Sequence, residues 1–409
     1  MRTHFLRGVS VAAALVVGAA GAPAVASPVG WTGGWESAQV AAPGDTGATN
    51  WSVTGFDHQS IREVVRVSRA GAAIRIRVSN VYGKTPLRLA GATVGQAADG
   101  AAVRAGSLRP VSFGWSLSTA VAAGRTAISD PVPLPVLGLD RLAVTLYFAG
   151  PTGPATFHPL ASATSYRAAG DHRSDSGSAA FNENSESWYY LSGVDVVGAT
   201  GRGTVVAFGD SITDGAFSSV DKNNRYPDEL AERLADGRPT GIANAGISGN
   251  RLLHDSPGFG DSGLSRFGRD VLGEPDVRTV IVLEGINDIG FGEGGLGELV
   301  SAQDLIGGYR ALIAAAHPRG IRVIGATLTP TEGCPYPGYD TPHGATVRAA
   351  VNQWIRTSGA FDAVVDFDHA LADPADPNRM RPAYDSGDHL HPSDAGYHAM
   401  ADAIDVRAL

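Results

Sequence analysis

The chain has 409 residues, 43% of them hydrophobic, and a formal net charge of −9. A chain of this length exceeds one typical hydrophobic core, so two domains are expected. The acidic balance excludes a general nucleic-acid binder, which needs a basic face, and gives no attraction to an anionic membrane surface. The single cysteine, Cys334, excludes an intramolecular disulfide, so the fold depends on its packed cores.

The first residues carry the three-part pattern of a secretory signal peptide. Arg2 and Arg7 give a positive start, and Val9–Ala20 is a short apolar stretch. Ala24–Ala26 then offers small residues at a cleavage site. The apolar stretch is too short to span a bilayer. We expect residues 1–26 to be a signal peptide cut after its last alanine, Ala26, which predicts a secreted protein without a stable membrane anchor.

Residues 27–198 consist of short apolar runs between turns, with no helical pattern of any length. Ile61–Val67 is rich in β-branched residues, while Ile74–Val78 and Arg141–Phe148 alternate between apolar and polar positions. Such runs are typical of antiparallel strands. We expect an antiparallel β-sandwich-like domain, for which substrate or glycan binding is one role, ending at a glycine-rich hinge over Gly198–Gly203.

From residue 203 to residue 409, predicted strands alternate with predicted helices. The expected strands are Val205–Phe208, Ile242–Ala245, Thr279–Leu283, Ile321–Ala326 and Ala363–Phe367. The expected helices are Tyr226–Leu234, Leu305–Ala316, Thr346–Arg356 and Ser393–Ile404. This alternation predicts a parallel sheet with right-handed crossovers. Active sites of open α/β sheets lie at the carboxyl ends of such strands.

The first of these strands runs into a Gly-Asp-Ser turn. Gly209, Asp210 and Ser211 follow the apolar run directly, and Gly215 lies just beyond. Such a turn holds a serine at the carboxyl edge of the sheet. A serine hydroxyl attacks a carbonyl only when a base takes its proton, so Ser211 is a candidate nucleophile if a base exists elsewhere.

The candidate base lies near the carboxyl terminus. His391 follows Asp388 by three residues, a spacing at which the carboxylate can bind one ring nitrogen and leave the other for the serine. His389 is the rival base, but its side chain should diverge because it neighbours Asp388. The alternative reading, an Asp/His metal site, is disfavoured because no third ligand accompanies the pair.

Two further segments offer donors for an oxyanion. Gly249 lies in a turn after the second strand and can present a backbone N–H without a side chain in the way. Asn287 follows the third strand and can donate from its side-chain amide. Each preorganised donor of this kind typically contributes a factor of about 10²–10³ in rate. Either segment alone is also compatible with an ordinary turn.

Together, these segments resemble the SGNH/GDSL hydrolases, from about Thr204 to the end of the chain. The family's blocks match Gly209-Asp210-Ser211, Ser248-Gly249-Asn250, Gly285-Ile286-Asn287-Asp288 and Asp388-His389-Leu390-His391-Pro392. The resemblance implies a flavodoxin-like three-layer α/β domain with a parallel sheet. It implies Ser211 as nucleophile, His391 with Asp388 as the rest of the triad, and an oxyanion hole of Ser211, Gly249 and Asn287. No metal and no organic cofactor is implied.

The family includes lipases, phospholipases, thioesterases and carbohydrate deacetylases. Gln59–Arg62 and Val78–Gly83 resemble segments of secreted actinobacterial members that carry a β domain and are compared with acetylxylan esterases. We therefore expect a secreted serine esterase acting on small-molecule or polysaccharide esters, with short-chain and especially acetyl esters favoured. A lipase or phospholipase A is one alternative. A glycan-binding protein with a vestigial hydrolase is another.

Aromatic and glycine-rich segments add weaker candidates. Four tryptophans of the β domain are expected in its core rather than on a sugar-binding surface; they are Trp31, Trp35, Trp51 and Trp115. Tyr336 and Tyr339 lie in a Pro/Gly loop beyond a strand end, where they could stack on a sugar or serve no specific role. The glycine-rich Gly290–Gly297 is either a mobile lid or a flexible surface connection.

Overall fold

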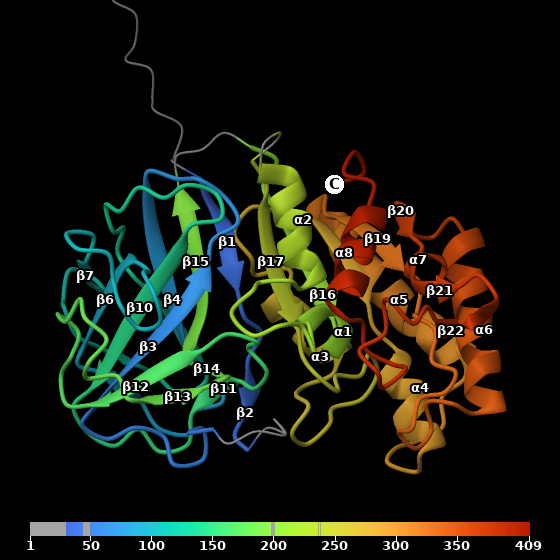
Figure 1. Cartoon of the computed structure of the whole chain (residues 1–409), viewed down its shortest axis with the longest axis horizontal. Helices are drawn as coiled ribbons and strands as arrows, with labels where there is room; N and C mark the ends of the chain where they lie inside the picture. The colour runs from blue at the N-terminus through green and yellow to red at the C-terminus, as the bar shows by residue number, and fades with distance from the viewer. Residues whose placement is uncertain (1–29, 44–49, 198–200, 236, 238) are drawn as a thin grey trace, which may run out of the picture.

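The computed structural model describes residues 30–43, 50–197, 201–235, 237 and 239–409. The predicted signal peptide lies outside these residues. Antiparallel sheets occupy the chain up to Val197, and the parallel sheet begins at Thr204. Figure 1 shows the two parts side by side.

The N-terminal part is built on two antiparallel sheets. One has the strand order β1 (Trp31–Glu36), β15 (Leu191–Val197), β4 (Ala73–Asn80), β9 (Arg125–Ile128). The other has the order β13 (Glu183–Ser185), β12 (Ser165–Ala169), β3 (Gln59–Arg66), β10 (Arg141–Phe148), β6 (Gly91–Gln96), β7 (Arg109–Val111). A smaller three-stranded sheet has the order β14 (Trp188–Tyr189), β11 (Thr156–His158), β2 (Val40–Ala41). Strands β5 (Leu87–Leu89) and β8 (Thr119–Val121) form a two-stranded sheet.

The alternation in the sequence explains these strands. Ile74, Ile76 and Val78 of β4 are fully buried, whereas the intervening Arg75 and Arg77 are partly exposed. Successive side chains of a strand point to opposite faces, so the apolar set enters the core while the arginines point to the other face of the sheet. This confirms the antiparallel β-sandwich-like domain.

The tryptophan prediction is right for two residues and wrong for one. Trp35 and Trp51 are each 7% exposed. Trp31 is half-buried under the guanidinium of Arg75. Trp115, however, is 84% exposed. It sits at the tip of a tight turn with a φ of 65°, so its side chain has no core to enter.

The C-terminal part is a five-stranded parallel sheet with helices. Its strand order is β17 (Gly241–Gly246), β16 (Thr204–Gly209), β18 (Val277–Leu283), β19 (Arg322–Ala326), β20 (Ala363–Val365). The helices are α1 (Ser211–Asp214), α2 (Tyr226–Ala235), α3 (Gly263–Asp270), α4 (Ile286–Glu293), α5 (Ala302–Ala316), α6 (Pro342–Thr357), α7 (Phe367–Leu371) and α8 (Asp394–Ala403), with a 3-10 turn at His317–Arg319. A hairpin pairs β21 (Ala372–Asp373) with β22 (Asp376–Met380). The predicted α/β class and all its predicted strands and helices are confirmed.

Three local expectations need correction. Gly290 to Glu293 form the end of helix α4, so the first half of the glycine-rich stretch is helical and only residues 294–297 form turns and bends outside the helix. Four helices, α1, α3, α4 and α7, were not predicted. The last strand is shorter than expected, since Asp366 caps helix α7 by accepting a hydrogen bond from the His369 backbone.

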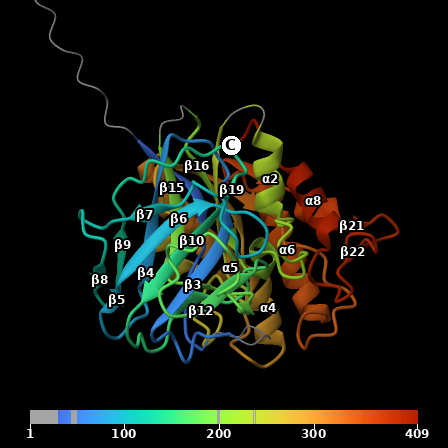
Figure 2. The ribbon, with the colours of Figure 1, turned by 60° about the vertical axis from the view of Figure 1, so that its left-hand side comes forward.

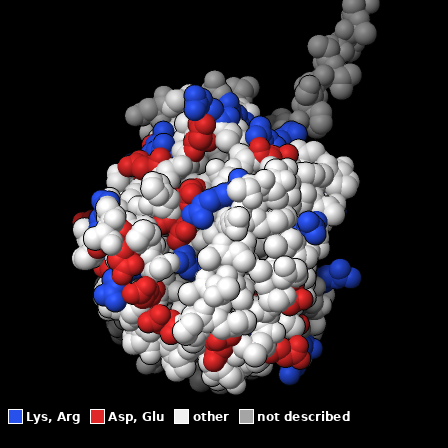
Figure 3. Space-filling model, turned by 90° about the vertical axis from the view of Figure 1, so that its right-hand side faces the viewer, with Lys and Arg blue, Asp and Glu red and all other residues white. Residues whose placement is uncertain are grey.

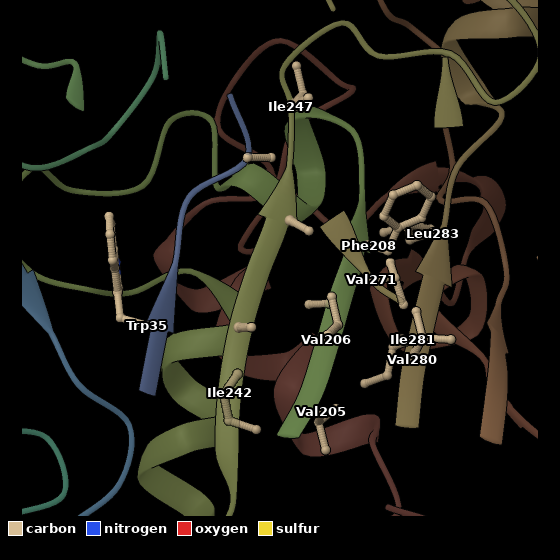
Figure 4. Close-up of a cluster of buried hydrophobic side chains, with 14 of the residues drawn as sticks. Trp35, Val205, Val206, Phe208, Ile242, Ile247, Val271, Val280, Ile281 and Leu283 are labelled. Atoms are coloured by element: carbon tan, nitrogen blue, oxygen red, sulfur yellow. The ribbon is translucent and has the colours of Figure 1, made fainter. Parts of the chain in front are cut away.

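Strand β16 forms the centre of the α/β core. All of its residues are buried, and Figure 4 shows it between β17 and β18 with Val205, Val206 and Phe208 among the apolar side chains. Helices α2 and α8 pack on each other beside the sheet. Helix α5 packs against both α3 and α6 and forms a second helical layer (Figures 1 and 2). Because both faces are covered, the strands are continuous apolar runs.

The two parts are joined along a sheet edge. Strand β1 runs beside the edge strand β17, and Ser37 pairs with Asn244 in a parallel bridge. The Tyr82 hydroxyl donates to the Asp261 carboxylate at 2.7 Å. The β domain thus covers an edge that would otherwise expose unpaired backbone groups. On the side of the α/β part that faces away from the β domain, acidic and basic side chains are interspersed around a large uncharged area (Figure 3).

Candidate active site

Ser211 lies where strand β16 meets helix α1. Asp210 caps this helix, and its carboxylate accepts a hydrogen bond from the Ile212 backbone at 3.0 Å. The helix ends one turn later at Gly215, which has a φ of 99°. This tight strand-to-helix turn holds Ser211 at the carboxyl edge of the sheet, where its side chain is nearly buried but lines a pocket.

The structure brings Ser211, His391 and Asp388 together. The Nε2 atom of His391 lies 2.8 Å from the Ser211 hydroxyl oxygen. Its Nδ1 atom lies 2.6 Å from a carboxylate oxygen of Asp388. Because Asp388 can only accept when ionised, Nδ1 carries the proton and Nε2 is free to accept from the serine. This is the arrangement that activates a serine hydroxyl.

The Asp388 carboxylate is held in its ionised form. Its other oxygen accepts hydrogen bonds from the backbones of Leu390 and His391 at 3.0 and 2.8 Å. Burial alone would raise its pKa, but the hydrogen bonds and charge of His391 and the backbone bonds hold the pKa of Asp388 well below its usual range. An ionised Asp388 fixes the ring orientation of His391.

The rival base, His389, points elsewhere. Its Nδ1 atom lies 2.5 Å from a carboxylate oxygen of Asp385, and its backbone N–H donates to the other oxygen at 3.0 Å. With a φ of 59°, the backbone at His389 turns its side chain away from His391. The expected divergence of the His389 side chain from Asp388 is therefore present.

Gly249 presents a backbone N–H to the same space. It follows β17 in a turn closed by the hydrogen bond from Asn250 to the Ile247 carbonyl, at 3.0 Å. Gly249 has a φ of 74°, and a Cβ atom there would lie 2.2 Å from the Phe259 ring, so only glycine fits. Its N–H has no acceptor among the described residues.

Asn287 completes the predicted set of oxyanion donors. It is the second residue of α4, and its side-chain nitrogen donates to the Asn250 carbonyl at 2.8 Å. Its side-chain oxygen accepts from the Tyr339 hydroxyl at 2.5 Å. One amide hydrogen of Asn287 stays available, and the residue lines one pocket with Ser211 and Gly249. The role of Tyr339 was missed, because nothing in the sequence near Tyr339 indicates this bond.

A buried arginine forms hydrogen bonds to the ends of the three strands that precede these groups. Arg266 of α3 donates to the carbonyls of Gly209 and Ala245, at 2.9 and 2.7 Å, and to the Glu284 carboxylate at 3.0 Å. These three partners belong to, or directly follow, β16, β17 and β18. The guanidinium also stacks 4.1 Å from the Phe208 ring centre. Removing one member of such a buried pair leaves an uncompensated charge, typically costing about 3–5 kcal/mol.

The triad opens into a pocket of about 570 Å³ with largely apolar walls. Its apolar lining residues are Leu160, Ala216, Phe217, Phe259, Phe291, Leu296, Tyr336, Pro337, Tyr339 and Leu390. The volume is within the range of small-molecule sites, about 300–1,000 Å³. Leu160 belongs to the β domain, so both parts of the chain build this pocket.

The described residues also bear on metal binding and on insertion into a membrane. No group of three or more His, Cys, Asp or Glu side chains in that part of the chain is arranged to hold a metal ion. None of its helices combines the length and apolar character needed to cross a membrane.

A parallel α/β domain with a Ser-His-Asp arrangement at its carboxyl edge is typical of serine hydrolases. Residues 207–399 match the GDSL-like Lipase/Acylhydrolase family, so this part of the chain is a domain of that family. The protein is accordingly a carboxylic ester hydrolase. No curated protein matches the chain.

Several solved structures are similar to the α/β part. A GDSL-like lipase from Bacteroides thetaiotaomicron is 20% identical over 50% of this chain and 87% of its own, with a TM-score of 0.38. The acetyl xylan esterase AlAXEase is 20% identical over 49% of this chain and 96% of its own, with a TM-score of 0.37. An inhibitor-bound aryl esterase from M. smegmatis is 18% identical over 50% of this chain and 99% of its own, with a TM-score of 0.40.

Proposed function

We propose that this protein hydrolyses carboxylic esters through a covalent acyl-enzyme. Ser211 attacks the ester carbonyl while His391 takes its proton. The negative charge on the carbonyl oxygen is met by the N–H groups of Ser211, Gly249 and Asn287. His391 returns the proton to the leaving alcohol, and a water molecule then releases the acid by the same route. Asp388 stabilises the imidazolium that forms.

The observation that carries this proposal is the unbroken chain of short contacts from Asp388 through His391 to Ser211. A hydrogen-bonded base within about 3 Å of the nucleophile is the geometry that general-base catalysis requires. Ser211 and His391 line a pocket together with Gly249 and Asn287. No cofactor takes part in this scheme.

For the substrate, we infer an ester with an apolar group larger than acetyl next to the carbonyl. The rings of Phe259 and Phe291 contact each other at a tilt in the pocket wall, with centres 5.4 Å apart, and the Phe217 ring centre lies 5.2 Å from that of His391. Burying an apolar chain against such walls gains about 25 cal/mol for each Å² removed from water. The acetyl group of the esters favoured by the sequence would fill little of this pocket and would gain little free energy from burial in it.

An assay of p-nitrophenyl esters from acetate to decanoate separates these substrates. The apolar pocket predicts that kcat/KM rises from acetate to about hexanoate or octanoate, since each added CH₂ buried contributes about 0.8 kcal/mol, or roughly fourfold. A maximum at acetate with a sharp fall beyond butyrate would instead support the acetyl esterase. Ser211→Ala measured in parallel corrects for spontaneous hydrolysis.

The lipid-ester alternative has one supporting observation. Phe217 and Leu296 line the pocket yet are 57% and 74% exposed, so an apolar rim surrounds the entrance. Exposed apolar side chains around a pocket are common where apolar substrates enter. Activity on emulsified triacylglycerol or on phospholipid vesicles, compared with soluble esters at equal concentration, distinguishes a lipase or phospholipase A from a soluble-ester hydrolase.

The glycan-binding alternative concerns the β domain. Trp115, at 84% exposure, offers a flat apolar face to a sugar ring. Sedimentation with insoluble xylan tests this role, using the whole protein carrying Ser211→Ala and the same protein carrying Trp115→Ala as well. Glycan binding is supported if the protein with Ser211→Ala alone sediments with xylan and the protein that also carries Trp115→Ala does not. It is contradicted if both proteins stay in the supernatant.

We also propose that the protein is exported. The support is the signal-peptide pattern of residues 1–26 and the resemblance of the β domain to that of secreted actinobacterial members. N-terminal sequencing of the protein from the culture medium should begin at Ser27. Recovery of full-length protein from the cells alone would contradict export.

A further inference from the structure

A histidine of the β domain is buried against the α/β domain. His158 ends strand β11 and is 2% exposed. Its Nδ1 atom lies 2.7 Å from the Ala38 carbonyl oxygen, and its Nε2 atom lies 2.9 Å from a carboxylate oxygen of Asp214. Both partners are acceptors, so both ring nitrogens donate and His158 is an imidazolium.

The surroundings of His158 agree with this charge. Burial and the nearby Arg225 lower the pKa of His158, but the charge and hydrogen bonds of Asp214 and Ala38 outweigh them and raise it above its usual value. The Leu160 carbonyl lies 3.3 Å from Nε2 as a further acceptor.

The carboxylate of Asp214 connects this histidine to the oxyanion turn. Asp214 is the last residue of α1, three residues beyond Ser211. Its other oxygen accepts from the backbone N–H of Ser248 at 3.0 Å and from the Ser248 hydroxyl at 2.9 Å. Ser248 directly precedes Gly249, so Asp214 holds the peptide just before the one that carries this oxyanion donor, and also the Ser248 side chain.

Residues that follow His158 in the β domain also contact the active-site pocket and the chain beyond Ser211. Leu160 lines the pocket. The Ser162 hydroxyl is 3.4 Å from the Gly215 carbonyl, and the Thr164 backbone donates to Asp221 at 2.7 Å. The segment 158–164 therefore runs along the chain that follows Ser211 and is part of the active-site wall.

We propose that His158 is a positioning residue for ester hydrolysis, through which the β domain holds the oxyanion turn in place by way of Asp214 and Ser248. This inference rests on the proposed esterase function. A buried carboxylate without its cation must take up a proton or admit water. Either change weakens the two bonds to Ser248 and lets the Gly249 N–H drift, and small displacements of a preorganised donor reduce kcat strongly.

Two variants that carry the same amide group at different side-chain lengths test this role. His158→Gln places an amide nitrogen near the Nε2 position and keeps a donor to Asp214. His158→Asn places it near Nδ1 and keeps only the donor to Ala38. We expect kcat to fall about tenfold or more in His158→Asn and about threefold or less in His158→Gln, with KM within about twofold in both, because the loss concerns transition-state stabilisation.

The control is His172→Asn. His172 has the same kind of partners, Asp175 at 2.8 Å and the Ala169 carbonyl at 2.9 Å, all within the β domain. It should leave kcat unchanged. Equal kcat values for wild type, His158→Asn and His158→Gln would overturn the proposal, as would equal losses in the two His158 variants.

Two further measurements do not depend on turnover. Amide hydrogen exchange of a peptide spanning residues 246–252 should speed up in His158→Asn and not in His172→Asn; unchanged exchange contradicts the proposal. NMR of the ¹⁵N-histidine-labelled wild type should show both His158 ring nitrogens protonated at neutral pH, and a neutral ring contradicts it even if no variant folds. If both measurements give the expected results but the wild type hydrolyses no ester, the proposed function is refuted and the positioning role of His158 is not.

Discussion

The hydrogen bond from Tyr339 to Asn287 gives a quantitative test of the oxyanion site. Tyr339→Phe removes the hydroxyl that donates to the Asn287 side-chain oxygen and keeps the ring that lines the pocket. Asn287 then retains only its bond to the Asn250 carbonyl. Turning the amide over would place its oxygen against this carbonyl, two acceptors facing each other, so the remaining bond still favours the productive orientation.

The size of the effect follows from this geometry. Losing a hydrogen bond of typical net strength, about 0.5–1.5 kcal/mol, loosens the amide without removing the donor. This corresponds to a reduction of kcat by about 2- to 13-fold. Asn287→Ala removes the donor itself and should reduce kcat by about 10²–10³. KM should change little in either variant, because the interaction strengthens only in the transition state.

Steady-state kinetics with one p-nitrophenyl ester measure both variants. Tyr189→Phe is the control, since the Tyr189 hydroxyl accepts from Trp51 at 2.9 Å and bonds Ser185 at 2.7 Å inside the β domain. It should lower thermal stability without changing kcat. A Tyr339→Phe enzyme as impaired as Asn287→Ala, or one indistinguishable from wild type, would refute the reasoning.

Three other predictions concern the triad and metal dependence. Ser211→Ala and His391→Ala should each abolish turnover while circular dichroism shows an intact fold. His389→Ala should keep near-full activity, because His389 bonds Asp385 instead; the reverse result for the two histidines would show that the base was misassigned. Since the pKa of Asp388 is depressed in the folded state, the carboxylate stabilises the fold above its unfolded pKa of about 3.9 and this contribution fades as pH falls through the folded pKa. Denaturant titrations of wild type and Asp388→Asn should therefore differ most near neutral pH and converge in acid, and a constant difference would contradict the shift. Excess EDTA should leave activity unchanged, and strong inhibition would reopen the metal-site reading of the Asp/His pair.

Much of the fold could be read from local patterns. Strict alternation at Ile74–Val78 requires a strand with one buried face, and the apolar runs at Val205–Phe208 and Thr279–Leu283 require strands covered on both faces. Local patterns were weaker where a segment continues an element that begins earlier in the chain. Gly290 to Glu293 are helical despite two glycines, because they continue a helix already started at Ile286.

The candidate triad could also be anticipated, for a topological reason. Parallel strands joined by right-handed crossovers all end at one edge, so blocks that follow these strands meet there whatever their separation in sequence. This argument covers Ser211, Gly249 and Asn287, which follow β16, β17 and β18. His391 lies instead in the loop between β22 and α8, and the tertiary structure brings it within hydrogen-bond distance of Ser211 across 180 residues. The three-residue spacing of Asp388 and His391 is itself a local signal.

The sequence by itself predicted the two fold classes and the residues expected to converge at the sheet edge, since periodicity, turn residues and the alternation of strands and helices can be read along the chain. Only the tertiary structure decided what supports those residues. The bond of Tyr339 to Asn287 spans 52 residues and that of His158 to Asp214 spans 56, and neither pair carries a local signature. Such contacts depend on how whole domains pack, because a side chain's partner is set by the surface it is pressed against.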